Sequence, residues 1–279
     1  MTESAKCRLC GSVENTVYQG AEPPYRVLRC SNCGLVYVDP QPDWTTGAYE
    51  EEYYRPWLEK QVDSRRRLWG RRLGEVEGFK PSRGLILDVG CGIPHFLQLA
   101  KRRGWKVVGT EVSSFACEYA SEKMRIDVRK GTLEQAGFDA ASMDAVTMWH
   151  VLEHVPEPIE TLREACRILK PGGLLVVAVP NIENHFKSFA YRLVKGKEEK
   201  LFSVKDREIH LFHFNEQTLR RAVEAAGFET LSQTIDRGEV APEKVLVELP
   251  ARLHYKLSGK NYTSGLRIYA ARPETGEYL

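Results

Sequence analysis

The sequence lacks any apolar run that approaches the length of a membrane span. Its first six residues, MTESAK, lack the apolar core of a secretory signal peptide. Internal repeats and low-complexity tracts are missing as well. We therefore expect a cytoplasmic protein, and we expect its cysteines to be reduced thiols rather than disulfides.

The net charge is also small, because 40 lysine and arginine residues face 38 acidic residues. A balance of +2 does not indicate a protein that binds nucleic acid or an acidic surface. One basic cluster does stand out: Arg65, Arg66, Arg67, Arg71 and Arg72. It could bind phosphate or an anionic substrate, but the neighbouring glutamates favour a solvated helix face.

Two C-x2-C pairs lie near the N-terminus: Cys7 with Cys10, and Cys30 with Cys33. Nineteen residues separate the pairs, a spacing that fits a four-cysteine zinc site. Two such turns complete a tetrahedron around one cation, and a zinc ion with four protein ligands is structural rather than catalytic. We expect a zinc ribbon over residues 1–43, with two disulfides or a chance spacing as the alternatives.

The rest of the chain is organised around the stretch LILDVGCG at residues 85–92. Its aliphatic residues predict a strand that is buried on both faces. Gly90 and Gly92 allow the backbone to turn sharply and to approach a ligand. Such a turn at the carboxyl end of a parallel strand is where open α/β sheets bind ligands, although an ordinary strand-to-helix turn has the same pattern.

Strands and helices alternate after this stretch. A second strand ends at Glu111, where a carboxylate can accept hydrogen bonds from both hydroxyls of a ribose. Further strands are predicted at 126–128, 143–150, 174–179, 230–235 and 266–271, and helices at 113–120, 159–169 and 215–226. This alternation predicts an α/β fold with a doubly wound, mostly parallel sheet.

These motifs resemble those of class I S-adenosylmethionine-dependent methyltransferases over residues 83–279. The resemblance rests on LDVGCG at 87–92, Glu111, HVLEHV at 150–155 and LKPGG at 169–173. HVLEHV and the later HLFHF run resemble the branch that includes ubiquinone-biosynthesis O-methyltransferases and bacterial small-molecule and glycan methyltransferases. The resemblance implies a Rossmann-like, seven-stranded sheet with an antiparallel last strand, and S-adenosyl-L-methionine as the cofactor.

The resemblance also implies roles for individual residues. Asp88, Gly90 and Gly92 would line the methionine end of the cofactor, and His150 would lie beside the methionine moiety. Glu111 would hold the ribose. Val112 would touch the adenine, and Thr132 and Leu133 would flank its edge. Two residues depart from the family pattern, because Pro94 replaces a usual glycine and Thr132 a frequent aspartate. Proline is tolerated in the first turn of a helix, but its ring takes space, so we expect somewhat weaker cofactor binding.

Transfer of a methyl group to a hydroxyl requires a group that takes the proton, and histidine suits this task near neutral pH. The candidates are His150, His154, His210 and His213, and His210 is preferred because it could line a substrate pocket. Three of them have a structural alternative: His154 could shape a loop or cap a helix, and His210 or His213 could be a hydrogen-bonded core residue. No carboxylate pattern in the sequence supports a metal site at these histidines.

Two other segments are candidates for contacts with substrate. The connector at 44–82 is predicted to form two helices broken at Pro56, whose aromatic residues pack on the main domain or form a lid. Residues 181–214 are predicted to form a substrate cap, because they follow the fifth strand at the ligand-binding edge of the sheet. An amphipathic surface helix is the alternative for the cap.

We therefore expect an S-adenosylmethionine-dependent methyltransferase that methylates an oxygen of a small-molecule, sugar or glycan intermediate. Three alternatives remain at this stage. A sugar C-methyltransferase would be a variant of the same reaction. An RNA methyltransferase would use the zinc ribbon and the connector arginines to bind phosphates. A non-catalytic, zinc-dependent scaffold would bind no cofactor.

Overall fold

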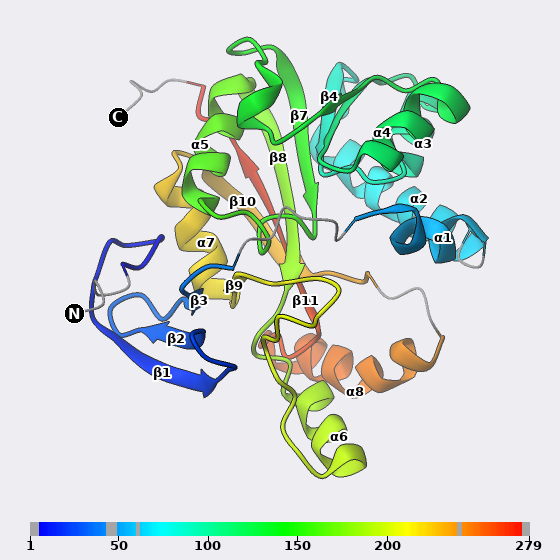
Figure 1. The fold of residues 1–279 in the computed structure, drawn as a ribbon. Helices are drawn as coiled ribbons and strands as arrows, with labels where there is room; N and C mark the ends of the chain where they lie inside the picture. Colours follow the sequence, from blue (N-terminus) through cyan, green and yellow to red (C-terminus); the bar gives the residue numbers. More distant parts are fainter. Residues whose placement is uncertain (1–5, 43–48, 60–61, 239–241, 275–279) are drawn as a thin grey trace.

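A computed structural model describes residues 6–42, 49–59, 62–238 and 242–274 (Figure 1). Its centre is a seven-stranded sheet in the order β10-β11-β8-β7-β4-β5-β6. The strands are β4 (Leu85–Val89), β5 (Lys106–Glu111), β6 (Val128–Lys130), β7 (Met143–Trp149), β8 (Leu169–Pro180), β10 (Glu229–Ile235) and β11 (Gly265–Ala271). Only β11 runs antiparallel to its neighbours, so the predicted mostly parallel sheet is confirmed.

Helices cover both faces of this sheet, as the alternating pattern predicts (Figure 1). One face carries α2 (Val62–Phe79), α3 (His95–Arg102) and α4 (Ser114–Tyr119), and the other carries α5 (Pro158–Ile168) and α7 (Glu216–Ala225). The predicted caps are present, because Ser113 Oγ accepts from Ala116 N and Asn215 forms a capping box with Thr218. These helices bury apolar stripes against β-strands whose side chains, such as Leu87 and Val176, are fully buried.

Two helices lie at the edge of the molecule below the sheet in Figure 1. They are α6 (His185–Lys195) and α8 (Pro242–Ser258), and they pack against each other. Among the described residues, no helix has both the length and the apolar character needed to cross a bilayer.

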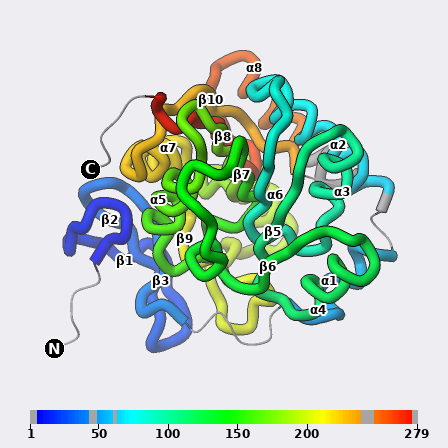
Figure 2. The backbone as a smooth tube through the Cα atoms, turned by 90° about the horizontal axis from the view of Figure 1, so that it is seen from above, coloured from blue at the N-terminus to red at the C-terminus, as the bar shows by residue number. Residues whose placement is uncertain are grey.

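A second sheet joins the N-terminal segment to the main domain. Its order is β1-β2-β3-β9, with β1 (Asn15–Gly20), β2 (Arg26–Cys30), β3 (Val36–Asp39) and β9 (Phe212–His213). The first three strands belong to the N-terminal segment, whereas β9 lies far along the chain in the methyltransferase-like part. Figure 2 shows this N-terminal segment beside α5 and α7, on the side away from α1 to α4.

Three local predictions are wrong. Pro56 does not break the connector but lies inside α1 (Glu51–Glu59), where the buried Tyr54 and the half-buried Trp57 hold the helix against the domain despite the lost backbone donor. The fifth strand does not begin at residue 174, because β8 already begins at Leu169 and pairs with β7 there. The third parallel strand lies two residues later than predicted. The predicted boundary at residues 43 and 44 lies outside the described residues.

Candidate active site

A cavity of about 630 Å³ opens at the carboxyl ends of the parallel strands, where α/β sheets bind ligands. The ends of β4, β5 and β7 form one wall, and α1 and α2 form the other. Of the part of the chain that the structure describes, six Tyr and Trp side chains line it: Tyr49, Tyr53, Tyr54, Trp57, Trp69 and Trp149. The volume lies within the range of small-molecule sites.

The turn after β4 is shaped by its glycines. Gly90 and Gly92 have φ values of +61° and +52°, which L side chains rarely adopt. A Cβ atom on Gly90 would lie 2.7 Å from Val151, and one on Gly92 would lie 3.1 Å from rings of Tyr54 and Trp57. Glycine is therefore required both by the backbone and by the close approach of other chain segments.

Glu111 lies at the end of β5 and is almost fully buried at the cavity wall. Its two carboxylate oxygens accept hydrogen bonds from the backbone N–H groups of Gly92 (2.8 Å) and Ser113 (2.9 Å). Burial raises the pKa of Glu111, although these hydrogen bonds oppose the shift. The acid thus joins the ends of two neighbouring strands and faces the cavity.

The other residues expected to bind cofactor also line this cavity. Asp88 is buried, accepts a hydrogen bond from Thr147 Oγ1 (2.6 Å), and burial raises its pKa to about 7. Val112 is 38% exposed beside Glu111, and Thr132 and Leu133 lie on the next segment. Among the described residues Pro94 does not line the cavity. The weaker cofactor binding expected from its ring stays a prediction.

His150 follows β7 with an unusual φ of +59°. Its Nε2 lies 3.2 Å from Asp236 Oδ2 and its Nδ1 lies 3.5 Å from Glu153 Oε1. Burial lowers the pKa of His150, but the two carboxylates outweigh burial and raise it to about 9. His150 is thus a cation near neutral pH, which disfavours the general-base role considered from the sequence.

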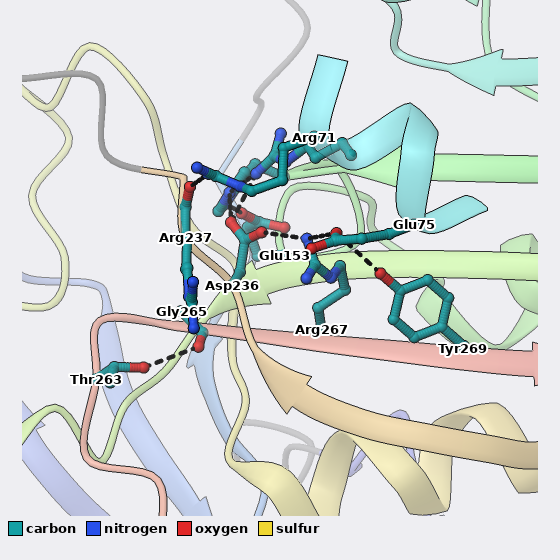
Figure 3. A network of polar contacts seen from close by, with 11 residues as sticks. Arg71, Glu75, Glu153, Asp236, Arg237, Thr263, Gly265, Arg267 and Tyr269 are labelled. Carbon is teal, nitrogen blue, oxygen red and sulfur yellow. Dashed lines mark hydrogen bonds and ion pairs between the residues drawn. The ribbon is translucent and has the colours of Figure 1, made fainter. Parts of the chain in front are cut away.

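Asp236 is the centre of a buried polar network (Figure 3). Its carboxylate accepts hydrogen bonds from Arg72 (2.6 Å) and Arg267 (3.3 Å), and Arg267 also pairs with Glu75 (2.8 Å). Burial would raise the pKa of Asp236, but Arg72 and its other cationic partners hold it well below the usual range. The sequence analysis missed this residue, although its position directly after β10 was a usable signal, because β10 is parallel to β8 and ends at the same edge.

A second cluster of ionisable side chains borders the cavity beyond His150. Glu153, His154 and His210 bring their ligand atoms within 4.8 Å of one another. His154 Nδ1 donates to the backbone carbonyl of Ile209 (2.7 Å), and within the described part of the chain neither buried oxygen of Glu153 has a hydrogen-bond partner. The sequence pattern did not show a carboxylate beside these histidines, but the structure places that of Glu153 there.

The other two histidine candidates lie behind His154. The rings of His154 and His210 are 4.8 Å apart, and those of His210 and His213 are 6.1 Å apart. Burial lowers the pKa of His210 and lowers that of His213 to about 3, so His213 is neutral. Of the histidines that the structure describes, His150 and His154 line the cavity and His210 does not, although His210 was the preferred base.

Comparison with known proteins agrees with this architecture. A family model described as "Methyltransferase domain" matches residues 61–233. The chain belongs to the S-adenosylmethionine-dependent methyltransferases of class I.

Relatives with curated names include ubiquinone biosynthesis O-methyltransferases. The protein from Alkalilimnicola ehrlichii is 36% identical over 115 residues, covering 39% of this chain and 44% of the relative. That from Maricaulis maris is 34% identical over 145 residues, covering 50% and 56%. The methyltransferase thus matches about half the length of these relatives.

Solved structures show the same fold. A SAM-dependent methyltransferase from Thermotoga maritima has a TM-score of 0.54 at 25% identity, with 79% of this chain and 97% of that chain covered. One from Archaeoglobus fulgidus has a TM-score of 0.51 at 21% identity, with 78% and 99% covered.

The four cysteines of the methyltransferase's N-terminal segment meet at one point. All four Sγ atoms lie within 4.8 Å of one another, and the pairs Cys7–Cys33 and Cys10–Cys30 are each 3.5 Å apart. A zinc ion with Zn–S bonds of about 2.3 Å separates its tetrahedral ligands by roughly 3.8 Å. The hydrogen bond with Cys33 lowers the pKa of Cys7 to about 5 and raises that of Cys33, and burial raises the pKa of Cys10, so one thiolate is favoured in the cluster without a metal. The cysteines therefore fit a zinc ribbon.

The connector contributes more to the cavity than its charge pattern suggests. Arg66, Arg67 and Arg71 are exposed, as expected for a solvated face. Arg72 is 2% exposed, and Arg65 stacks 3.6 Å from the Trp57 ring; both line the cavity. The solvated-face prediction is wrong for these two residues, because long-range contacts turn them inward.

The predicted substrate cap contributes one described residue to the cavity wall, Glu208. Its carboxylate accepts a hydrogen bond from Tyr53 OH (2.6 Å) and so links the cap segment to α1. Helix α6 packs on α8 instead, with Phe189 and Leu193 largely exposed.

Proposed function

We propose that this protein transfers the methyl group of S-adenosyl-L-methionine to an oxygen of a small-molecule, sugar or glycan acceptor. The observation that carries the proposal is the position of His154. It lies at the cavity wall beside a buried carboxylate, with one ring nitrogen already engaged.

The residues of the β4 and β5 ends fit the cofactor. Glu111 suits a ribose diol, Gly90 and Gly92 keep the turn free of side chains, and Asp88 offers a carboxyl group to the methionine end. Val112, Thr132 and Leu133 would border the adenine. When bound, the cofactor supplies a methyl group that its sulfonium already activates, so positioning is the main contribution of the protein.

His154 is proposed as the general base. A carbonyl oxygen can only accept, so the bond to Ile209 places the proton of a neutral ring on Nδ1 and leaves Nε2 able to take a proton. The Glu153 carboxylate, 4.0 Å from Nε2, would stabilise the imidazolium that forms. His150 would remain protonated between its two carboxylates and would favour an acceptor oxygen that gains negative charge.

The cavity favours a small acceptor over RNA. Among the described residues its lining holds more acidic than basic side chains, and the two arginines are used inside the fold, Arg72 with Asp236 and Arg65 on Trp57. The cysteine segment packs its own residues Leu28 and Tyr37 into the main hydrophobic core. Both features leave little basis for a phosphate-binding groove.

The four cysteines are proposed to hold one structural zinc ion. Replacing Cys30 with Ser should release the metal and disorder the N-terminal segment. Metal analysis of the purified protein measures this directly, and a variant that retained one zinc per chain would contradict the four-cysteine assignment. Cys117→Ser, outside the cluster, is the control.

The test of the activity is titration with S-adenosylhomocysteine, followed by an acceptor screen with hydroxylated aromatics and sugars. We expect micromolar binding by the wild type, and we expect His154→Gln to bind equally well but turn over about 10²–10⁴ times more slowly. Product analysis separates O-methylation from C-methylation. Absence of binding by the wild type would contradict the proposal and favour the scaffold alternative.

A further inference from the structure

The cysteine segment is not a separate appendage, because its last strand is completed by the main domain. Val36 pairs with His213 and Tyr37 with Phe212, and Val38 N donates to Leu211 O (2.9 Å). Three ribbon cysteines, Cys7, Cys30 and Cys33, belong to the same buried cluster as residues of β4, β5, β7, β8 and α7. The segment therefore holds the backbone of residues 211–213 from one side.

The same backbone stretch is held from the other side by the end of the HVLEHV run. The N–H groups of Leu211 (2.8 Å) and Phe212 (3.1 Å) both donate to the carbonyl of Glu153. Two residues earlier, the carbonyl of Ile209 accepts the hydrogen bond from His154 Nδ1. The stretch 209–213 thus lies between the cysteine ribbon and the side chains proposed to take the proton.

We infer that the metal-bound ribbon positions His154. Through β3 and β9 the ribbon fixes the carbonyl of Ile209, and this carbonyl sets the tautomer of His154. The inference rests on the proposed function. Val38 and Tyr37 are positioning residues in this scheme, since they act through β9 and not on the substrate. The ribbon would then control the acceptor side of the cavity without contacting the acceptor.

The cofactor side should not share this dependence. Glu111 and the glycine turn are fixed by hydrogen bonds among the ends of β4 and β5 and by Ser113. In the sheet order β4 and β5 lie four and five positions from β10, the edge strand that contacts α7. Figure 2 shows β5 apart from the ribbon strands β1 to β3. Loss of the ribbon should therefore affect the two halves of the cavity differently.

The experiment compares the full-length wild type with Cys30→Ser and Val38→Pro. The first variant removes the metal, and the second keeps all four cysteines but removes the N–H that Val38 donates to Leu211. Tyr18→Pro is the matched control, because it places a proline in the same ribbon at the bulge between β1 and β2. Zinc content, S-adenosylhomocysteine affinity, hydrogen exchange at 209–213 and the ¹⁵N shifts of the His154 ring are measured for each.

We expect exchange of the Leu211 and Phe212 amides to accelerate at least tenfold in both test variants, with a changed His154 tautomer signal. We expect cofactor-product affinity to stay within about twofold, and Tyr18→Pro to match the wild type. Unchanged exchange and an unchanged His154 signal in Val38→Pro would overturn the inference. Failure of the wild type to bind S-adenosylhomocysteine would instead contradict the proposed function, because the exchange and ring signals do not depend on it.

Discussion

The two halves of the cavity are built in different ways. The half proposed to bind the cofactor, the cofactor half, is formed mainly by residues that follow β4 and β5 directly, and its acid Glu111 is satisfied by backbone N–H groups. The half proposed to bind the acceptor, the acceptor half, is assembled from segments far apart in the sequence: α2, the end of β7, the stretch near Ile209, and the end of β10. Helix α1 borders both halves, because Tyr54 and Trp57 lie against Gly92 and Tyr53 donates to Glu208. Local sequence thus specifies most of the cofactor half, whereas tertiary packing specifies the acceptor half.

The difference extends to charge. The cofactor half has a buried carboxylate held by neutral donors, while the acceptor half contains a network of full charges around Asp236 (Figure 3). His150 contacts this network through Asp236. Buried charges are costly unless each finds its partner. The acceptor half should therefore be the more sensitive to the loss of one side chain.

The largest effect is expected from Asp236→Asn. The side chains of Asp236 and Arg72 are 1% and 2% exposed, so the variant would leave the buried charge of Arg72 without its carboxylate partner. Arg267 and His150 would each lose one of two carboxylate partners and keep Glu75 and Glu153, respectively. We expect the free energy of unfolding to fall by about 3–5 kcal/mol, measured by urea denaturation at pH 7.

The control for this prediction is Glu160→Gln. Its pair with Arg163 is as short, at 2.6 Å, but both side chains are more than half exposed. We expect a loss below about 1 kcal/mol. Similar losses for the two variants would show that burial of the Asp236 network does not matter.

A smaller effect, on binding, is expected from Glu111→Ala. The variant leaves the N–H groups of Gly92 and Ser113 without their acceptor and removes the carboxylate proposed to hold the ribose. We expect the affinity for S-adenosylhomocysteine, measured by calorimetry, to fall about 10- to 100-fold, or about 1.4–2.7 kcal/mol. Glu118→Ala, an exposed acid on α4, should bind as the wild type does, and equal losses would remove Glu111 from the site.

The comparison also explains what the sequence could predict. Buried strands, glycine turns and acids at strand ends are local features, so the seven-stranded sheet and the wall formed by Asp88, Gly90, Gly92 and Glu111 were predictable. The same holds for the cysteine cluster, because two turns of fixed spacing define it. Pro56 and the start of β8 were missed because packing overrode local preference.

For the acceptor half, the sequence predicted some of the residues that are present but not the contacts that they make. The sequence named His150, His154 and His210, but their roles depend on the partners that tertiary contacts bring: Asp236 for His150, and the Ile209 carbonyl for His154. Asp236 carries no motif, and Arg72 looked like one arginine of a solvated cluster. Which of several identical residues turns inward is decided by the whole fold.

A pH-dependent effect separates His150 from the rest of the acceptor half. Its pKa is raised from 6.5 to about 9, so its stabilising contribution is complete below pH 6.5 and is lost as the pH rises through 9. We expect the wild type to melt higher than His150→Gln at pH 6, with a gap that narrows steadily towards pH 9.5. Since the side chain is 39% exposed at the cavity, the gap should be a few degrees at most. A gap that is constant with pH would contradict a charged His150.

The smallest effect is expected from Pro94→Gly. The variant tests whether the cofactor half, which is held by backbone hydrogen bonds, tolerates the loss of one side chain. Pro94 precedes α3 with a φ of −79°, which suits proline, and it is buried away from the cavity lining that the structure describes. We expect the affinity for S-adenosylhomocysteine to change by less than about twofold. We expect the free energy of unfolding to fall by about 0.4–1 kcal/mol, because glycine increases the conformational entropy of the unfolded chain. Pro158→Gly, at the start of α5, should show the same stability loss. A tenfold gain in affinity for Pro94→Gly alone would mean that the proline ring obstructs the cofactor. The replacement of the family's usual glycine by Pro94, rather than the geometry of the cavity, would then limit binding.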